Sequence, residues 1–279
     1  MSEYNLVVDG DLVLSTSEVD GSAIVGGSIL GGTSNYGVQG VTASDHSALA
    51  VGGSVASGVT LNINGGGDFR ISDPASQFGT VNVNGGTTVV DPGIASRVTG
   101  YMDEARSMSA LLSALPVTGT IDAAGNFSSP TTLSLDGFSV AVYEVSQGLF
   151  DSGLGQFNLN MGAADTVIIN YSSSNGIADL GAPPNLVGAF NQANSGRILW
   201  NFGDVTDITI NNNFNGAILA PDASLSLEGG GINGAVVVRE VMTQQAEIRL
   251  NLYTGYVPTP GAACCLFVVA AVGHSRRRR

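Results

Sequence analysis

Apolar and polar residues alternate over short stretches of this chain, and most stretches end at glycine. Residues 60–64 (Thr-Leu-Asn-Ile-Asn) run into Gly65-Gly66-Gly67, and residues 81–84 (Val-Asn-Val-Asn) run into Gly85-Gly86. A period of two is typical of strands with one buried face, and glycine adopts the positive φ angles of tight corners. The pattern predicts short strands with glycine corners across residues 5–92.

The Gly-Gly corners are spaced by lengths that suit stacked coils. Pairs at Gly26-Gly27, Gly52-Gly53, Gly65-Gly66 and Gly85-Gly86 lie 13 to 26 residues apart. Coils of β-solenoids have similar lengths, so the segment is predicted to form stacked turns of a solenoid. A β-sandwich with glycine-rich hairpins is the alternative.

Residues 94–115 follow a different period and predict one inserted amphipathic helix. Pro92-Gly93 precede this segment and Pro116 ends it. Asp103, Glu104 and Arg106 fall on its polar face. Its apolar positions recur mostly at steps of three or four and are expected to contact the core: Val98, Met102, Ala105, Met108, Leu111, Leu112 and Leu115.

Strand patterns resume after the helix. Residues 131–135 and 138–145 predict a hairpin around Asp136-Gly137, whereas residues 172–196, rich in Ser, Asn, Gly and Pro, predict mostly a long surface loop. Further strands are expected at residues 166–171, 198–202, 208–210, 217–219, 225–227, 235–238 and 248–252.

The charge balance excludes one class of function. The 279 residues include 39 glycines and no lysine, and ten arginines stand against 23 acidic residues, for a net charge of −13. Without the four terminal arginines, six remain against 23 acidic residues. A body this acidic argues against nucleic-acid binding, which needs a positive surface, and fits a solvated surface protein.

The segments at the C-terminus follow one another in the order of a targeting signal. A turn at Val257, Pro258, Thr259 and Pro260 precedes an apolar run at residues 262–272, and the chain closes on Arg276, Arg277, Arg278 and Arg279. The run has about 11 residues, whereas a spanning helix needs about 20. Arginines after it are expected to stay cytoplasmic, with the body outside. A frayed hydrophobic tail is the plain alternative.

This tail resembles the PEP-CTERM class of bacterial sorting signals, with Thr259 where that family usually has glutamate. The resemblance implies export, a short hydrophobic helix in transient membrane contact, and a sorting protease or transpeptidase as partner. The first residues, Met1-Ser2-Glu3, lack the basic and apolar regions of a signal peptide, so export requires a leader that this sequence does not contain. The only cysteines, Cys264 and Cys265, lie in the apolar run, where lipidation is an alternative role and a disulfide framework is excluded.

Several segments of the body together carry a resemblance: residues 4–12, 17–21, 23–27, 167–171, 198–202, 216–223, 232–238 and 247–248. Through them the body resembles the bacterial choice-of-anchor A surface domain over residues 4–255. That resemblance implies placement at the cell surface and adhesion to an extracellular polymer or matrix protein, with no catalytic residues. The Gly-x-Ile-Leu-Ala-Pro turn at residues 216–221 is also similar to that of discontinuous β-helix ice-binding domains.

Candidate chemistry is sparse. Of the two histidines, His46 lies in a polar loop and His274 in the tail, so no nucleophile–histidine–acid trio can be argued. Calcium is the ion best suited to the oxygen ligands of the aspartates, but no calcium-binding loop motif is present and turn formation explains them more simply. We therefore expect no cofactor. The aspartates considered are Asp9, Asp11, Asp20, Asp204 and Asp207.

Several further residues have plain structural interpretations. Trp200 is expected in the core, the segment Ala220-Pro221-Asp222 at a corner, and Asn233 together with residues 211–213 in an asparagine ladder or in left-handed corners.

Together these features predict an all-β fold: a right-handed β-helix, or solenoid-like, domain over residues 4–255 with the inserted helix, then a sorting segment over residues 256–279. The function expected is a non-catalytic, exported surface or matrix adhesin. The alternatives are a β-helix enzyme that degrades polysaccharide, whose carboxylates can lie far apart in sequence, and an ice-binding-like surface protein. Ice binding needs flat ranks of threonine, and Thr60, Thr80 and Thr209 look scattered along the chain.

Overall fold

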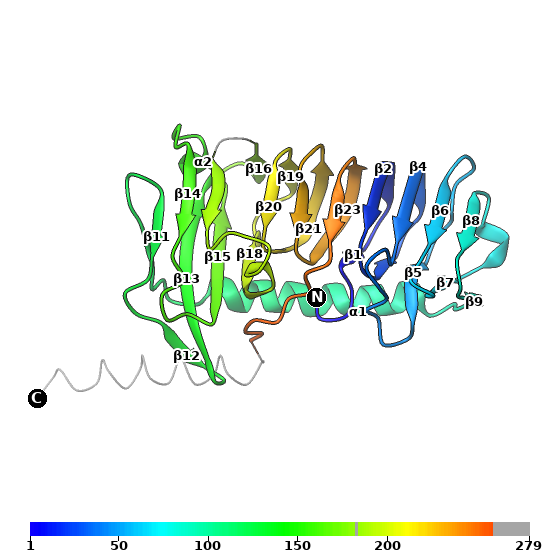
Figure 1. Cartoon of the computed structure of the whole chain (residues 1–279), viewed down its shortest axis with the longest axis horizontal. Helices are drawn as coiled ribbons and strands as arrows, with labels where there is room; N and C mark the ends of the chain where they lie inside the picture. The colour runs from blue at the N-terminus through cyan, green and yellow to red at the C-terminus, as the bar shows by residue number, and fades with distance from the viewer. Residues whose placement is uncertain (182–183, 259–279) are drawn as a thin grey trace, which may run out of the picture.

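The strands form the coils of a three-sided β-helix, and a long helix lies along one side (Figure 1). The computed structural model describes residues 1–181 and 184–258. Most strand pairs are parallel and join one coil to the next. The alternation expected from the sequence turns one set of side chains inward, and glycine corners such as Gly37 and Gly65, at φ of 68° and 65°, let the chain change direction.

The first side lies under the helix, and strands at its centre, such as β1, β3 and β5, are buried on both faces. Its strands are β1 (Leu6–Val8), β3 (Ala23–Val25), β5 (Ser47–Val51), β7 (Asp68–Ile71), β9 (Thr88–Val90), β13 (Phe138–Ser146), β15 (Thr166–Ser172), β18 (Ile198–Asn201) and the first parts of β21 (Ala217–Leu227) and β23 (Val236–Gln244).

The other two sides each bury one face. The second side contains β16 (Ile177–Leu180), β19 (Asp207–Ile210), the later parts of β21 and β23, and the first parts of β2 (Leu12–Val19) and β4 (Ile29–Tyr36). The third side contains β6 (Thr60–Ile63), β8 (Thr80–Val83), β20 (Asn213–Asn215), β22 (Gly231–Asn233), β24 (Glu247–Arg249) and the later parts of β2 and β4.

The coils are out of sequence order in the middle of the molecule. β1 pairs with β3 on one side and with β23 on the other, with Leu6 opposite both Ala23 and Val236. The N-terminal half therefore stacks on the end of the C-terminal half, and Figure 1 shows the blue and orange strands side by side. We call this junction the seam.

Asn5 connects the two halves at the seam. This fully buried side chain donates Nδ2 hydrogen bonds to the carbonyl oxygens of Gly234 (3.1 Å) and Arg249 (3.2 Å), and its Oδ1 accepts from the amide of Gly21 (3.1 Å). One side chain thus joins three segments.

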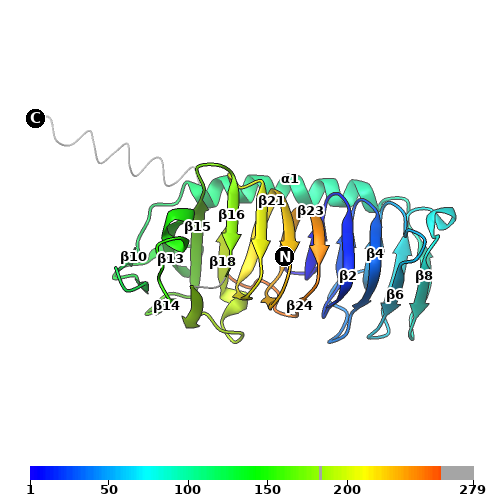
Figure 2. The same ribbon diagram turned by 90° about the horizontal axis from the view of Figure 1, so that it is seen from above.

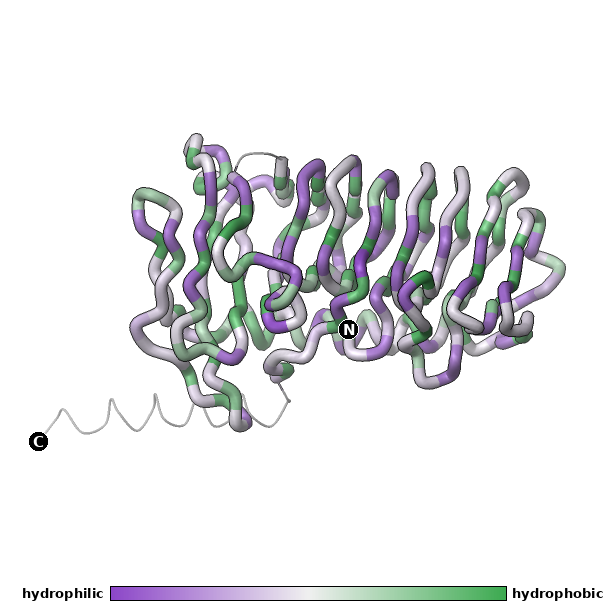
Figure 3. Tube along the Cα trace, viewed as in Figure 1, coloured by the Kyte–Doolittle hydropathy of each residue, from purple (hydrophilic) through white to green (hydrophobic). Residues whose placement is uncertain are grey.

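Two apolar clusters stabilise the fold. One fills the coil interior, where Trp200 stacks on Phe190 with ring centroids 5.6 Å apart. The other lies between the first side and α1 (Ile94–Ser113), whose buried positions include Val98, Met102 and Leu112. The alternation of hydrophobic and hydrophilic positions along the strands is visible in Figure 3.

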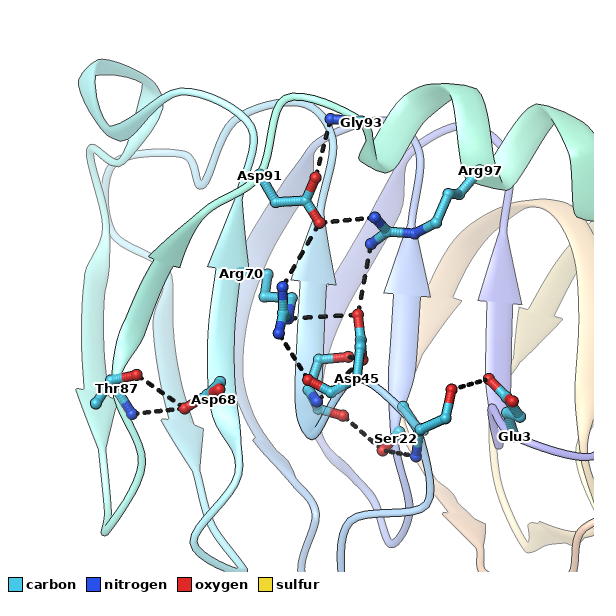
Figure 4. A network of polar contacts seen from close by, with 12 residues as sticks. Glu3, Ser22, Asp45, Asp68, Arg70, Thr87, Asp91, Gly93 and Arg97 are labelled. Atoms are coloured by element: carbon cyan, nitrogen blue, oxygen red, sulfur yellow. Dashed lines mark hydrogen bonds and ion pairs between the residues drawn. The ribbon is translucent and has the colours of Figure 1, made fainter.

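Ion pairs fix the start of α1 to the coils (Figure 4). Arg97 of the helix contacts Asp91 at 2.7 Å and Asp45 at 3.7 Å, and Arg70 of β7 contacts the same two aspartates at 3.7 and 3.3 Å. Asp91 also accepts a hydrogen bond from the amide of Gly93 (3.0 Å). From this anchor the helix runs along the middle part of the solenoid, as Figure 2 shows.

The two ends of the solenoid differ. At one end, β12 (Leu133–Leu135) is a short strand that pairs antiparallel with β13. A separate small sheet lies at the same end, in which β10 (Thr120–Ile121) pairs antiparallel with β11 (Asn126–Ser128), and β11, β14 (Gln156–Leu159) and β17 (Asn185–Gly188) follow as parallel strands. At the other end the last strands are β8 and β9. The short helices are α2 (Gln147–Phe150), η1 (Pro74–Ser76) and η2 (Ser195–Arg197).

Most predicted elements are present, and two strands lie in a segment that was expected to be mostly loop. The inserted helix is confirmed, as is the hairpin of β12 and β13, with Asp136 and Gly137 at positive φ. Residues 172–196, predicted mostly as a surface loop, contain β16 and β17, because the alternation at residues 177–180 buries Ala178 and Leu180 in the coil interior. The division between residues 255 and 256 stays a prediction, and the expected C-terminal helix lies outside the described residues. In the described part of the chain, no helix is both long and apolar enough to cross a membrane.

Candidate binding face

The most regular surface of the molecule is on the third side, where threonines from four coils stand in one rank. Parallel pairing places Thr16 opposite Thr33, Thr33 opposite Thr60, and Thr60 opposite Thr80. Two residues further along each strand, a second rank follows the same register: Glu18, Asn35, Asn62 and Asn82. We call these eight residues the Thr/Asn face.

The residues between the two ranks point inward and anchor the face. Ser17, Ser34 and Leu61 alternate with the two ranks and are buried, and Ser17 Oγ donates to Ser34 Oγ at 3.4 Å. In the first rank, Thr16 and Thr80 are exposed, and the threonines between them are half-buried. Adjacent strands are separated by about 4.8 Å and alternate residues of one strand by about 6.7 Å, so the face is a two-dimensional lattice of small polar groups.

Hydrogen bonds order the second rank. Asn62 Nδ2 donates to Asn35 Oδ1 and Asn82 Nδ2 donates to Asn62 Oδ1, both at 3.0 Å. Beyond the strands, Asn84 Nδ2 donates to Asn64 Oδ1 at 3.0 Å. Each amide therefore has a fixed orientation before any ligand arrives.

The face is charged at its seam end, where Glu18 stands in the second rank in place of asparagine. Arg249 Nε lies 2.8 Å from Glu247 Oε2 on β24, the strand that pairs with β2. Desolvation, and then the negative charges of Glu247 and Asp20, raise the pKa of Glu18. The uncharged lattice thus lies on the β4, β6 and β8 side of this border.

Four of the five aspartates considered for calcium have other partners, and the fifth, Asp204, lines a hollow described below. Asp11 Oδ1 accepts from the Ser28 amide (2.7 Å), Asp20 Oδ2 from the Leu250 amide (3.1 Å), and Asp207 Oδ2 from Thr206 Oγ1 (2.8 Å). Asp9 lies 3.7 Å from Arg106. Among the described residues, no group of three or more histidine, cysteine or acidic side chains is placed to hold a metal ion.

The expected structural residues are in place. Trp200 is fully buried and donates from Nε1 to the carbonyl of Asn215 (3.1 Å). Asn233 Nδ2 donates to Asn215 Oδ1 (2.8 Å), so it belongs to an asparagine ladder. Pro221 lies where β21 passes from its pairing with β18 to its pairing with β19, which is a corner between two sides. His46 is exposed in a loop.

A polar hollow of about 580 Å³ lies beside α1. Its lining includes Arg106, Glu144, Tyr171 and Asp204. Arg106 is engaged there, because its Nε lies 2.8 Å from Asp222 and its NH1 lies 3.3 Å from Asp103. Glu144 and Asp204 in this hollow are candidate carboxylates for the alternative, a polysaccharide-degrading enzyme.

The predicted sorting signal is described only at its start. Val257, half-exposed, and Pro258 line a second hollow of about 740 Å³ with Tyr4, Tyr101 and Met108. Thr259, Pro260 and the four arginines from Arg276 to Arg279 lie outside the described residues.

The expectation that the threonines are scattered is wrong for two of the three residues on which it rested. Thr60 and Thr80 stand in one rank, whereas Thr209 of β19 is on the second side. Unequal numbers of residues between the strands conceal the alignment in the sequence. A repeated pattern could have shown it: Thr-x-Glu at residues 16–18, then Thr-x-Asn at residues 33–35, 60–62 and 80–82.

One family model matches most of the chain. A family model described as "Putative Ice-binding-like adhesive domain" matches residues 1–250. Among solved structures, an ice-binding protein from the Antarctic ascomycete Antarctomyces psychrotrophicus is similar, with 12% sequence identity, coverage of 91% of this chain and 96% of that chain, and a TM-score of 0.40. No curated protein matches.

Proposed function

Because this chain belongs to the family of ice-binding-like adhesive domains, we propose that it is the non-catalytic adhesive part of an exported surface protein, and that it binds through the Thr/Asn face. The observation that carries the proposal is the register of Thr16, Thr33, Thr60 and Thr80 across four coils. The expected ligand is a solid or polymer whose polar groups repeat at a fixed spacing.

The physical argument is pre-organisation. A lattice of short side chains on a β-helix loses little conformational entropy on binding, and the bonds at 3.0 Å between Asn35, Asn62 and Asn82 have already ordered the longer ones. Each contact is weak, but neighbouring contacts form together when the ligand has a matching repeat, and their effects multiply.

Two ligand classes follow from this geometry. An extracellular polysaccharide or matrix polymer is the first, in keeping with an adhesive family. Ice is the second, and the threonine rank specifically favours it, because each threonine presents a methyl and a hydroxyl group in a regular array. The charged border at Glu18 and Glu247 limits the ice-like area to the coils of β4, β6 and β8.

The test compares one bulky substitution on two sides of the solenoid. Thr60→Tyr interrupts the rank, and Thr209→Tyr on the second side is the matched control. Wild-type protein and both variants are sedimented with cellulose or chitin particles and, separately, assayed for adsorption to growing ice. Loss of binding in T60Y with retention in T209Y supports the proposal. Binding that survives T60Y, or fails for wild type on both materials, contradicts it.

The enzyme alternative has its own assay. Purified wild-type protein is incubated with soluble polysaccharides, and new reducing ends are measured over time. Sustained cleavage that is lost in a variant combining Glu144→Gln and Asp204→Asn, which alters the hollow beside α1, would replace adhesion with catalysis as the function.

Export and sorting form a separate part of the proposal. Val257, Pro258, Thr259 and Pro260, with the arginines at 276–279, are proposed as the signal that a sorting protease or transpeptidase removes after transient membrane contact. The intact mass of native protein from the cell surface and medium tests this. A species ending near residues 256–260 supports sorting, and a full-length cytosolic species contradicts it.

A further inference from the structure

The end of the solenoid formed by β8 and β9 has an open sheet edge. Within residues 1–181 and 184–258, β8 pairs only with β6 and β9 only with β7. The opposite end is different, because it finishes on short antiparallel strands, β10 beside β11 and β12 beside β13. Terminal coils of repeat proteins normally carry a cap.

The open edge presents unpaired backbone groups. The amides of Thr80 and Asn84 donate toward β6, to the carbonyls of Val59 (2.9 Å) and Ile63 (2.8 Å). Because hydrogen-bonding direction alternates along a strand, the N–H and C=O groups of Val81 and Val83 point away from β6. The same alternation in β9 points those of Thr88 and Val90 outward.

This edge lacks the usual protection against pairing. Residues 79–90 contain no charged residue and no proline, whereas natural edge strands are blunted by lysine, proline or bulges. The core is also open here: Val81 and Val83 are only partly buried against it, and Val90 is 55% exposed.

We propose that this end is a homodimer interface, in which β8 pairs antiparallel with β8 of a second copy. A two-fold axis through the pair at Asn82 places Val81 opposite Val83 of the second copy, and the reverse. Both residues present outward N–H and C=O groups, so the pairs exchange hydrogen bonds in the pattern of an antiparallel ladder. The edge is therefore complementary to itself.

Charge favours this partner. The chain carries a net charge of −13, so contact between copies is repulsive over most of the surface, and an uncharged edge of twelve residues avoids that repulsion. The opposite end finishes on strands of only two and three residues, a poor match for β8, so the two-fold arrangement is favoured over head-to-tail stacking. An axis perpendicular to the third side also makes the two Thr/Asn faces one continuous surface. The inference does not depend on what that surface binds.

A charge introduced at the two-fold axis tests the register of the proposed β8–β8 pair. Asn82→Lys and Asn82→Asp each place two like charges opposite one another in the dimer. Thr60→Lys is the matched control, with the same added charge on the same side, one coil away from the edge. The full chain and its variants, in a mild detergent, are followed by sedimentation velocity over a wide range of concentration.

Wild type and T60K are expected to approach twice the 28.3 kDa mass of the chain. N82K and N82D are each expected to stay monomeric, at least tenfold weaker in association, and an equal mixture of the two is expected to recover the dimer. Unchanged circular dichroism spectra show that the variants are folded. A monomeric wild type, or a mixture that fails to recover association, overturns the proposal.

Discussion

Asn5→Ala is the most direct perturbation of the seam. The substitution removes both Nδ2 hydrogen bonds to Gly234 and Arg249 and the acceptor for the amide of Gly21. No other side chain is introduced, so the three backbone groups lose a partner at a site where Asn5 has no exposed surface. The two halves of the chain still have the matching register between β1 and β23.

The expected loss of stability follows from the three backbone groups that lose their hydrogen-bond partner. An unsatisfied buried polar group costs about 1–3 kcal/mol, and partial relaxation or entry of water reduces the sum. We expect a loss of about 2–4 kcal/mol in the free energy of unfolding, from a total of about 5–15 kcal/mol for a typical domain. For a chain of this size, that corresponds to a fall in Tm of about 5–15 °C.

The assay is thermal unfolding followed by circular dichroism. Asn84→Ala is the matched control, because it removes one exposed side-chain hydrogen bond to Asn64 within a single half. This change should cost less than about 1 kcal/mol. Equal melting temperatures for N5A and N84A would refute the reasoning, since the seam would then not depend on Asn5.

Three further predictions concern the helix anchor, the core and the helix itself. The hydrogen bond from Arg97 lowers the pKa of Asp91, so this carboxylate stabilises the fold above the unfolded pKa of about 3.9 and the stabilisation is lost as the pH falls through the lower folded value; Asp91→Asn should flatten the acid limb of a plot of unfolding free energy against pH, and an unchanged limb would contradict it. Trp200→Ala should cost about 3–5 kcal/mol in denaturant unfolding, because the side chain is fully buried among aromatic rings; a cost under about 1 kcal/mol would show that the ring is not part of the core. Gly100→Ala should raise the free energy of unfolding by about 0.5–1 kcal/mol, because the position is inside α1 and an added Cβ meets nothing within 4 Å. Gly31→Ala should lower the free energy of unfolding, because Gly31 has φ +91° and its added Cβ would lie 2.1 Å from the Leu14 carbonyl oxygen. A change of the same sign in both variants would refute the argument.

The sequence predicts what is local. The helix at residues 94–113 has its own period and its own prolines, and the turn at Asp136-Gly137 carries the residues that a tight hairpin requires. Alternation also locates most strands, because one buried face is a property of each strand separately.

The alignment of residues between neighbouring coils is harder to predict from the sequence. The rank of Thr16, Thr33, Thr60 and Thr80 depends on register, and the connections between those strands differ in length. The strand at residues 177–180 is concealed among loop-forming residues, because its stability comes from pairing with β19 and not from its own composition.

The seam determines the order in which this molecule can fold. The contact between Asn5 and Gly234 joins residues 229 positions apart, so the first coil made by the ribosome has to wait for nearly the last. Until residues 236–249 emerge, the edge of β1 and β2 that they cover is exposed to other chains. Contacts of this separation slow folding, and a truncated chain would lack the partner that completes its N-terminal half. The stack of coils is therefore complete only when the chain has been synthesised as far as residue 249.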